Sequence, residues 1–340
     1  MGVASSMVAT LVSAAVVMPS PSGTSLAQAR FSPVSVQGQI QGQTQGATQG
    51  QPRSFGARAS REHTASDALD GFETASGPAD GGLDAADMDV LGYDLDAVLQ
   101  GHGEVPRITL ASLPGDFARI RETDERKAVF FKTVLPLVLQ VNEQILEDRQ
   151  RLWELGAEIK AGTPLDAVDR LWLAVMAERY GTRRNNVDAL LARHDVVPPS
   201  LAIAQAATES AWGTSRFVKE GNAMFGEWTF ASKHDGIVPS ARVKGKTHRV
   251  RAFASLYDSV RSYVTNLNKH RAYREFRALR AAMRAKGQTL DGMRLAATLH
   301  RYSERGAAYV AELHAIIGGN NLDMLDGARL SQAGDIEPLI

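Results

Sequence analysis

The sequence predicts a predominantly helical α+β fold, in which one small β lobe interrupts a series of helices. Apolar residues recur at helical spacing through most of residues 124–317. Residues 222–253 instead alternate between apolar and polar positions and are rich in β-forming residues, which favours a small hairpin or short sheet. Hydrophobic residues make up 44% and charged residues 22% of the 340-residue chain, which is typical of a soluble protein.

The N-terminal residues have the pattern of a secretion signal. Residues 7–18 are apolar and small, and Ala27-Gln28-Ala29 matches a small-x-small cleavage site, although no Lys or Arg precedes the apolar segment. The apolar segment is too short to cross a membrane. We therefore expect a signal peptide over residues 1–29, export to the periplasm or cell envelope, and no integral membrane segment in the mature chain.

Residues 30–103 are expected to form a disordered linker. A four-residue repeat that begins with Gln-Gly runs from Gln37 to Pro52, and the following residues are rich in Ala, Gly and Asp. Such a segment buries too little apolar surface to offset its chain entropy. The acidic stretch around Asp84, Asp87 and Asp89 lacks the glycine and terminal glutamate of an EF-hand loop, so it predicts no calcium site.

The folded part is expected from about Glu104, with a helical N-terminal region over 104–195. Its first helix covers 124–155, where Pro136 should kink or divide it. A second helix covers 165–180, with Thr163 as its cap and Pro164 in its first turn, and a third covers 186–194. Ser200 should cap the next helix, which continues to Trp212 and ends before Gly213. Further helices are expected over 256–268, 272–286, 290–299 and 307–317, and a tail over 323–340.

Charge and residue types narrow the possible partners. Residues 1–103 contain four basic and ten acidic residues in a chain of zero net charge, so the remainder carries a net charge of +6. That excess suits a polyanionic partner or is simply a solvated surface. The absence of Cys excludes disulfides and thiolate sites. The eight His residues lack metal-site spacing, and no phosphate loop or nucleic-acid motif occurs. We expect no metal, no cofactor, no nucleic-acid partner and a monomer.

Glu209 is the first candidate for chemistry. It lies near the C-terminal end of an Ala-rich apolar helix, four residues before Gly213. The negative end of the helix dipole and the apolar surroundings should both raise its pKa. A carboxylic acid with a raised pKa is what protonation of a glycosidic oxygen requires. By spacing alone, however, a surface glutamate with a helical partner is the simpler interpretation.

The residues around Glu209 carry a family resemblance. Ala207-Thr-Glu-Ser-Ala-Trp-Gly-Thr-Ser-Arg216, followed by Gly221-Asn-Ala-Met-Phe-Gly226, resembles the glucosaminidase family of peptidoglycan hydrolases. Gly226-Glu-Trp-Thr-Phe230 and the stretch 199–322 look like the bacterial Bax-type proteins of that family, with similarity that extends upstream to about Val105. The resemblance implies a lysozyme-like fold, with an α lobe and a small inserted β lobe, and a catalytic domain over 196–322. It also implies hydrolysis of the β-1,4 bond between N-acetylglucosamine and N-acetylmuramic acid in peptidoglycan glycan strands.

The resemblance also implies roles for single residues. Glu209 matches the family's general acid, and Tyr302 stands where the family has a functional tyrosine. Ser303-Glu304-Arg305 departs from the family pattern after that tyrosine, so a core role for Tyr302 stays open. Asn222, Phe225 and Gly226 match the segment that shapes the cleft wall.

A second catalytic carboxylate is less clear from the sequence. Glu227, directly after the Phe-Gly turn, is the first candidate, and Asp235 in a His-Asp-Gly turn is the alternative. Substrate assistance by the 2-acetamido group would need neither carboxylate. Asp258 matches its counterparts only loosely and is more typical of a helix cap.

Several aromatic side chains could stack on sugar rings. The candidates for this role are Trp212, Trp228 and Tyr263, with Tyr257 and Tyr273 also available, and at least two of the five should be core residues. The basic stretch from Arg242 to Arg251 could contact anionic peptide stems or form a solvated face. An endo-β-N-acetylglucosaminidase is the favoured function. A lytic transglycosylase and a non-catalytic cell-wall binding or scaffold protein are the alternatives.

Overall fold

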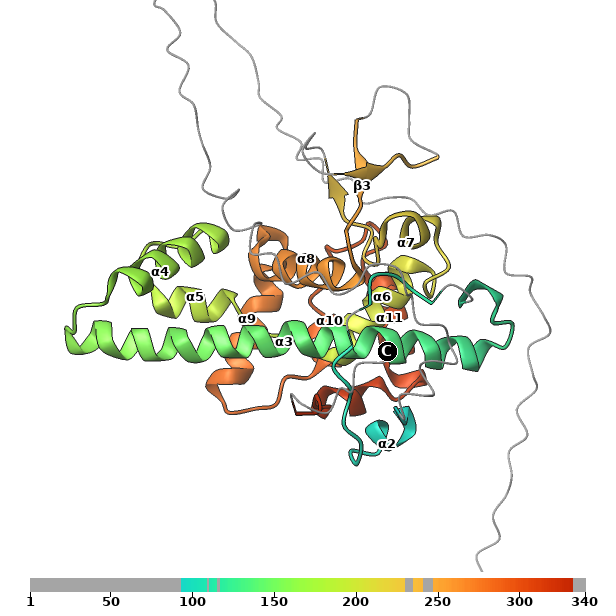
Figure 1. The fold of residues 1–340 in the computed structure, drawn as a ribbon, viewed down its shortest axis with the longest axis horizontal. Helices are drawn as coiled ribbons and strands as arrows, with labels where there is room; N and C mark the ends of the chain where they lie inside the picture. The colour runs from blue at the N-terminus through green and yellow to red at the C-terminus, as the bar shows by residue number, and fades with distance from the viewer. Residues whose placement is uncertain (1–92, 109, 115–116, 230–234, 241–246, 333–340) are drawn as a thin grey trace, which may run out of the picture.

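The computed structural model describes residues 93–108, 110–114, 117–229, 235–240 and 247–332. The expected signal peptide, nearly all of the expected linker and residues 333–340 of the expected tail lie outside the described residues. The described part is predominantly helical with one small sheet, as the sequence predicts (Figure 1).

Helix α3 (Thr123–Ala161) lies along the long axis of the molecule (Figure 1). The Glu122 side chain caps its start by accepting hydrogen bonds from the backbone N–H groups of Asp124 and Glu125, and Gly162, at φ 74°, ends it. Pro136 lies inside the helix and does not divide it. The reason is packing. The neighbours Leu135 and Leu137 are fully buried, so the burial of this section outweighs the backbone hydrogen bond that proline removes.

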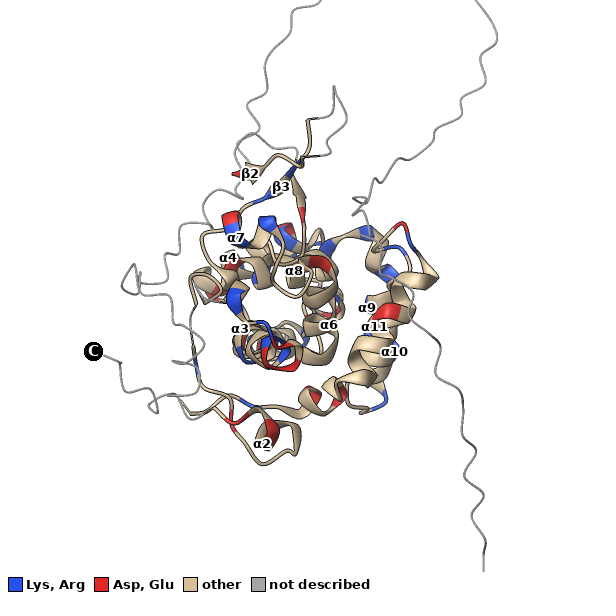
Figure 2. Cartoon of the chain, turned by 90° about the vertical axis from the view of Figure 1, so that its right-hand side faces the viewer, with Lys and Arg blue, Asp and Glu red and all other residues tan. Residues whose placement is uncertain are grey.

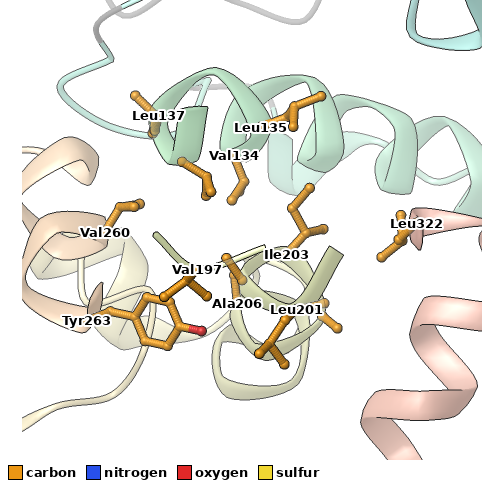
Figure 3. Packing of buried hydrophobic residues seen from close by; sticks show 14 of the residues in the cluster. Val134, Leu135, Leu137, Val197, Leu201, Ile203, Ala206, Val260, Tyr263 and Leu322 are labelled. Carbon is orange, nitrogen blue, oxygen red and sulfur yellow. The ribbon is translucent and has the colours of Figure 1, made fainter. Parts of the chain in front are cut away.

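Two hydrophobic cores lie along α3. The larger one joins its first half to α6 (Pro199–Ser210) and α8 (Leu256–Lys269), which lie beside α3 in the view along its axis (Figure 2). In this core Val134 of α3, Ile203 of α6 and Val260 of α8 point toward one another (Figure 3). The smaller core joins the end of α3 to α4 (Ala167–Tyr180) and α5 (Val187–Arg193). The helical region before α6 therefore has a core of its own.

Two predicted helix starts differ from the structure. Helix α4 begins after Asp166, whose carboxylate accepts a hydrogen bond from Asp169 N at 2.8 Å, so Asp166 and not Thr163 is the cap. Helix α6 begins at Pro199, and Ser200 lies fully buried in its first turn. Ser200 N and Oγ both donate to the carboxylate of Asp326, each at 2.9 Å, so the capping group comes from a residue 126 positions later.

Helix α6 also ends earlier than predicted. It stops at Ser210, and Ala211 and Trp212 have φ of 50° and 56°, so Trp212 stands outside the helix. Gly213 continues the turn at φ 76° and lies so close to Leu113 that a Cβ would be 2.7 Å from Leu113 Cδ1. Glycine adopts this left-handed conformation without strain. Three successive left-handed residues, 211–213, therefore turn the chain out of the helix after Ser210.

The β lobe follows α7 (Arg216–Gly221). It contains β1 (Trp228–Thr229), β2 (Gly236–Ile237) and β3 (Arg249–Arg251), in the antiparallel order β1-β3-β2. In the register, Val250 of β3 pairs with Trp228 on one side and Ile237 on the other. The small sheet predicted within residues 222–253 is confirmed.

The remaining helices are α2 (Leu95–Leu99), η2 (Phe117–Arg119), η3 (Arg271–Tyr273), α9 (Arg274–Ala285), α10 (Gly292–Ala296), α11 (Ala307–Gly319) and η4 (Leu322–Gly327). Of these, α10, α11 and η4 pack directly on α6. Helix α2 lies in the segment expected to be linker, and η4, in the segment expected to be tail, packs on α6. Val105 and Leu330 form a parallel bridge, so the two edges of the described domain meet. The folded unit is therefore wider at both ends than residues 104–322.

One described helix, α3, is long and apolar enough for a membrane span. However, 72% of its apolar window is buried inside the fold, as expected for the core helix of a globular domain.

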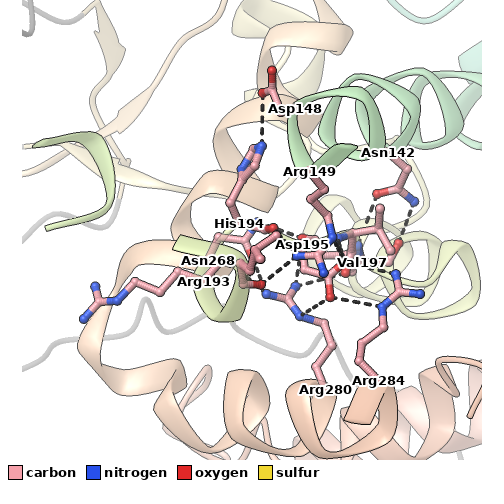
Figure 4. Close-up of polar contacts among 12 residues, drawn as sticks. Asn142, Asp148, Arg149, Arg193, His194, Asp195, Val197, Asn268, Arg280 and Arg284 are labelled. Atoms are coloured by element: carbon pink, nitrogen blue, oxygen red, sulfur yellow. Dashed lines mark hydrogen bonds and ion pairs between the residues drawn. The ribbon is translucent and has the colours of Figure 1, made fainter. Parts of the chain in front are cut away.

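A buried ion cluster, made of Asp195, Arg149, Arg280 and Arg284, holds the segment between α5 and α6 (Figure 4). The carboxylate of Asp195 lies 3.3 Å from Arg149, 3.0 Å from Arg284 and 3.8 Å from Arg280. Arg280 is fully buried and also donates to the backbone carbonyls of Asp195 and Val196. These guanidinium groups hold the pKa of Asp195 below its usual range despite the opposing effect of burial.

Replacing Asp195 by Ala should destabilise the fold by roughly 3–5 kcal/mol, because it leaves buried guanidinium groups without their counter-charge. Urea unfolding followed by circular dichroism measures this. Asp188→Ala is the matched control, since its side chain is 81% exposed and 3.9 Å from Lys160, and it should change stability by less than about 1 kcal/mol. Equal effects of the two substitutions would contradict a supporting role for the ion cluster.

Candidate active site

Glu209 lies in the last turn of α6, facing the turn that leads into the β lobe. A Cβ placed on Gly226 would be 3.9 Å from Glu209 Oε2, so the backbone of this turn passes directly beside the carboxyl group. Gly226 has φ 60°, a left-handed conformation that glycine adopts without strain. The Glu-Ser-Ala-Trp-Gly and Asn-Ala-Met-Phe-Gly segments, separate in sequence, therefore meet at one carboxyl.

Burial raises the pKa of Glu209 to about 7. A hydrogen bond from the Tyr309 hydroxyl opposes this shift by favouring the ionised form. Glu312 raises the pKa further by charge repulsion, and Arg305, which pairs with Glu312 at 2.5 Å, lowers it. The predicted direction is confirmed, with burial as the main cause. A carboxyl with this pKa can hold a proton near neutral pH.

A network of buried hydroxyl and amide groups lies behind Glu209. Gln205, one helical turn earlier on α6 and fully buried, donates from Nε2 to the Tyr309 hydroxyl at 2.8 Å. Its Oε1 accepts a hydrogen bond from the Tyr263 hydroxyl at 2.7 Å. The Tyr302 ring stacks on Tyr309, with centroids 5.6 Å apart and planes 2° apart. Glu209 raises the pKa of Tyr302, which shows that this tyrosine is near the carboxyl.

Sequence reasoning missed Gln205 and Tyr309. The i, i+4 spacing of Gln205 and Glu209 on one apolar helix was a signal, because a buried amide there needs polar partners. Tyr309 had no local signal, since its contact with α6 is set by tertiary packing.

Glu227 stands directly after the Gly226 turn, on the β-lobe side of the site. Its Oε2 accepts a hydrogen bond from Ser262 Oγ of α8 at 2.8 Å, and Arg251 of β3 donates to the same Oγ at 3.1 Å. Its backbone carbonyl accepts from Arg251 N at 2.7 Å. Among the described residues, the buried Oε1 of Glu227 has no hydrogen-bond partner. Ser262 is thus a further site residue that sequence reasoning missed, and Arg251, expected only within the basic stretch, lies beside Glu227.

Burial raises the pKa of Glu227 to about 7 as well. Burial raises the pKa of Tyr273, and the charges of Glu227 and Glu209 raise it further. Glu209, from α6, and Glu227, from the turn before β1, therefore both act electrostatically on this one tyrosine. Asp235 is instead exposed at the edge of the sheet, and Asp258 lies in the first turn of α8, where its carboxylate accepts a hydrogen bond from Ser255 Oγ at 2.7 Å.

The expected sugar-binding aromatic residues fall into two groups. Trp212 and Trp228 are partly exposed. Trp212 packs against Phe131 with centroids 5.8 Å apart, and Trp228 stacks on His248 at 3.9 Å. Phe225 and Tyr263 stack on each other at 3.9 Å and are closed to solvent, so they form the floor beneath the site. Between these two groups, a sugar could reach only Trp212 and Trp228, and Tyr257 is partly exposed as well.

Asn222, the remaining predicted contact, ends α7 at φ 52°. Its Nδ2 donates to the carbonyl of Phe253 at 3.2 Å, and this bond connects the segment before the Phe-Gly turn to the segment that joins β3 to α8. Within the described residues, no three His, Asp or Glu side chains gather in a way that could hold a metal ion.

The two carboxyls should also affect stability. The pKa of Glu227 is about 7 in the folded state and about 4.5 in the unfolded chain, so the folded state binds more protons between these values. Wild-type stability therefore falls as pH rises from 4.5 to 7. Glu227→Gln should match the wild type near pH 4.5 and exceed it by up to about 3 kcal/mol above pH 7.

Urea unfolding at pH 4.5, 6 and 8 measures this difference. Glu220→Gln is the control, because Glu220 is half-exposed on α7, and its effect should not vary with pH in this way. A stability difference for Glu227→Gln that stays constant from pH 4.5 to 8 would contradict the raised pKa.

Comparison with known proteins identifies the family of the chain. Residues 185–322, which include Glu209, Glu227 and Tyr302, match the Glucosaminidase family, described as mannosyl-glycoprotein endo-beta-N-acetylglucosaminidase. The chain is 31% identical to Protein bax of Escherichia coli (strain K12) over 216 residues, which are 62% of this chain and 75% of that protein. No solved structure matches the chain. The chain belongs to the glucosaminidase family, a family of glycosidase type, and within it to the Bax-type proteins.

Proposed function

We propose that this protein is an endo-β-N-acetylglucosaminidase that hydrolyses the β-1,4 glycosidic bond in peptidoglycan glycan strands, with Glu209 as the general acid. The observation that carries this proposal is the Glu209 carboxyl, whose pKa of about 7 allows it to hold a proton at neutral pH. It faces the β lobe, as expected for an acid that reaches a chain lying between the two lobes. Membership of a glycosidase family supports the same reaction.

In the proposed reaction, protonated Glu209 donates its proton to the glycosidic oxygen as the bond to the sugar carbon breaks. Positive charge then develops on the sugar ring, which has oxocarbenium character. The Tyr309 hydroxyl orients the Glu209 carboxyl and stabilises the carboxylate that forms, since it already donates a hydrogen bond to it. Gln205 in turn holds that hydroxyl at 2.8 Å. Tyr302, stacked on Tyr309, is proposed to keep water away from the acid.

Glu227 is the proposed second carboxylate. In its ionised form it would accept a proton from the attacking water, while Ser262 stabilises its negative charge through the hydrogen bond to Oε2. The proton that Glu227 takes from water balances the one that Glu209 gives to the leaving sugar. Trp212 and Trp228, the partly exposed rings, are the proposed stacking surfaces for the sugars.

The expected secretion signal places this reaction in the periplasm or cell envelope. A peptidoglycan substrate is found in the same compartment, so the proposed location and the proposed activity are consistent.

Glu209→Gln should lower product release from purified sacculi by roughly 10²–10⁴-fold, because an amide cannot donate the proton. Mass spectrometry of the soluble products measures this and identifies the new chain ends. Glu220→Gln on α7 is the matched control and should keep wild-type activity. Full activity of Glu209→Gln would exclude Glu209 as the acid. Anhydromuramic ends would identify a lytic transglycosylase, and binding without any product would identify a wall-binding protein.

The activity should depend on pH in the form of a narrow bell centred near 7. The rising side follows loss of the proton from Glu227, and the falling side follows loss of the proton from Glu209, since both have a pKa of about 7. In Glu227→Gln the residual kcat/KM should lose its rising side and keep its falling side between pH 5 and 9. A bell that persists in this variant would rule out Glu227 as the base.

A further inference from the structure

A cavity of about 910 Å³ lies apart from the candidate active site. Its walls are the middle of α3, the start of α6, and segments 284–290 and 326–330, and we call it the groove. Neither Glu209 nor Glu227 lines it. The groove meets α6 at Pro199, ten residues before Glu209, which places it about 15 Å from Glu209 along the helix axis. The groove and the candidate active site therefore lie at opposite ends of one helix.

Helix α3 gives the groove an exposed aromatic wall. Leu146, Gln150 and Trp153 share one face of α3, and all three line the groove. Trp153 is 60% exposed and Leu146 is 49% exposed, which are high values for large apolar side chains. An exposed indole beside amide side chains is a surface on which the C–H face of a sugar ring can stack.

The charge of the groove is positive. The ion cluster contains three guanidinium groups and one carboxylate, that of Asp195. Two of these guanidinium groups, Arg149 and Arg284, line the groove. Arg329, which is exposed, lines a further wall.

The acidic groups that line the groove are already engaged. Glu143 pairs with Arg107 at 2.5 and 2.7 Å, and the Asp326 carboxylate accepts hydrogen bonds from Ser200 and Gly292. With these acidic groups paired, the arginines that line the groove favour a ligand that carries negative charge.

We propose that the groove binds a carboxylate-bearing, N-acetylated glycan, namely a second segment of the polymer that the active site cleaves. This inference rests on the proposed function for the identity of the polymer. The indole of Trp153 stacks on a pyranose ring, and Arg284 and Arg329 pair with carboxylates of the lactyl groups or peptide stems. The amide of Gln288 and the hydroxyl of Thr289, both exposed, face the acetamido groups. Binding at this end of α6 would hold the protein on the wall while Glu209 acts at the other end.

The test uses the full chain with Glu209→Gln, so that sacculi are bound without being cleaved. Adding Trp153→Ala should weaken co-sedimentation with purified sacculi by roughly three- to tenfold, the order expected for losing one aromatic contact. The matched control is Leu171→Ala, because Leu171 is 66% exposed on α4 and outside the groove. This control should leave binding unchanged, and thermal melts should confirm that both variants are folded.

A second pair of variants tests the charge. Arg329→Glu should weaken binding to sacculi and to soluble muropeptides, and the loss should shrink at high salt. Arg184→Glu, at an exposed arginine outside the groove, is its control. Neutral N-acetylglucosamine oligomers distinguish stacking from charge, because their binding should depend on Trp153 and not on Arg329.

Cleavage by the chain with Glu209 intact is measured separately. Cleavage together with unchanged binding in both groove variants would overturn the groove site and leave the proposed function standing. Binding that depends on Trp153, without any cleavage, would support the groove site and reject the proposed function. A dimer that Trp153→Ala disperses in analytical ultracentrifugation would assign the groove to a second copy of the chain and overturn this inference.

Discussion

The carboxylate of Asp195 is the group on which the position of α6, and so of Glu209, depends. It follows α5 directly and draws together α3 through Arg149 and α9 through Arg280 and Arg284 (Figure 4). Buried guanidinium groups are tolerated only when they are paired and fully hydrogen-bonded. The polar contacts of Asp195 therefore hold three elements in one arrangement, where apolar packing alone would allow alternatives.

The segment just after Asp195 continues this support. Asn142 of α3 both donates to and accepts from the backbone of Val197, at 2.8 and 3.1 Å. Asn268 of α8 donates to the Asp195 carbonyl at 2.8 Å. Helix α6 begins two residues after Val197, and in its first turn Ser200 N donates a hydrogen bond to the carboxylate of Asp326. Because both the approach to α6 and its first turn are fixed, the last turn presents Glu209 in a defined place.

Local pattern was sufficient to predict most of the longer helices and the sheet between 222 and 253, whereas Glu209 was nominated through the motif around it. It failed where the deciding contact is distant in sequence. Ser200 resembles a cap, but its partner Asp326 is 126 residues away. Trp212 continues the apolar pattern of α6, yet the chain leaves the helix at Ala211 in a left-handed turn that packs against Leu113 and Phe117. Residues 323–332 are polar enough to suggest a tail, but their contacts with α6 and Val105 place them in the fold.

The same limit applies within the site. Glu227 could be nominated from its place after the Phe-Gly turn, whereas its partners Ser262 and Arg251 come from other elements and had no shared local pattern. Tyr263 and Phe225 were nominated as aromatic residues, and the structure shows their rings paired below the surface. Aromatic composition predicts that rings will gather near the site, but their burial decides which faces a sugar can reach.

Two buried carboxyls with raised pKa values lower the stability of the fold at neutral pH, and natural proteins commonly keep such strain where they need chemistry. Their pKa values of about 7 have another consequence, for encounter with a charged polymer. Two ionised glutamates would repel an incoming chain of carboxylates. Protonation near neutral pH weakens this negative charge, and acidification weakens it further. The repulsion that an anionic strand meets on entering the site is therefore graded by the acidity of its surroundings.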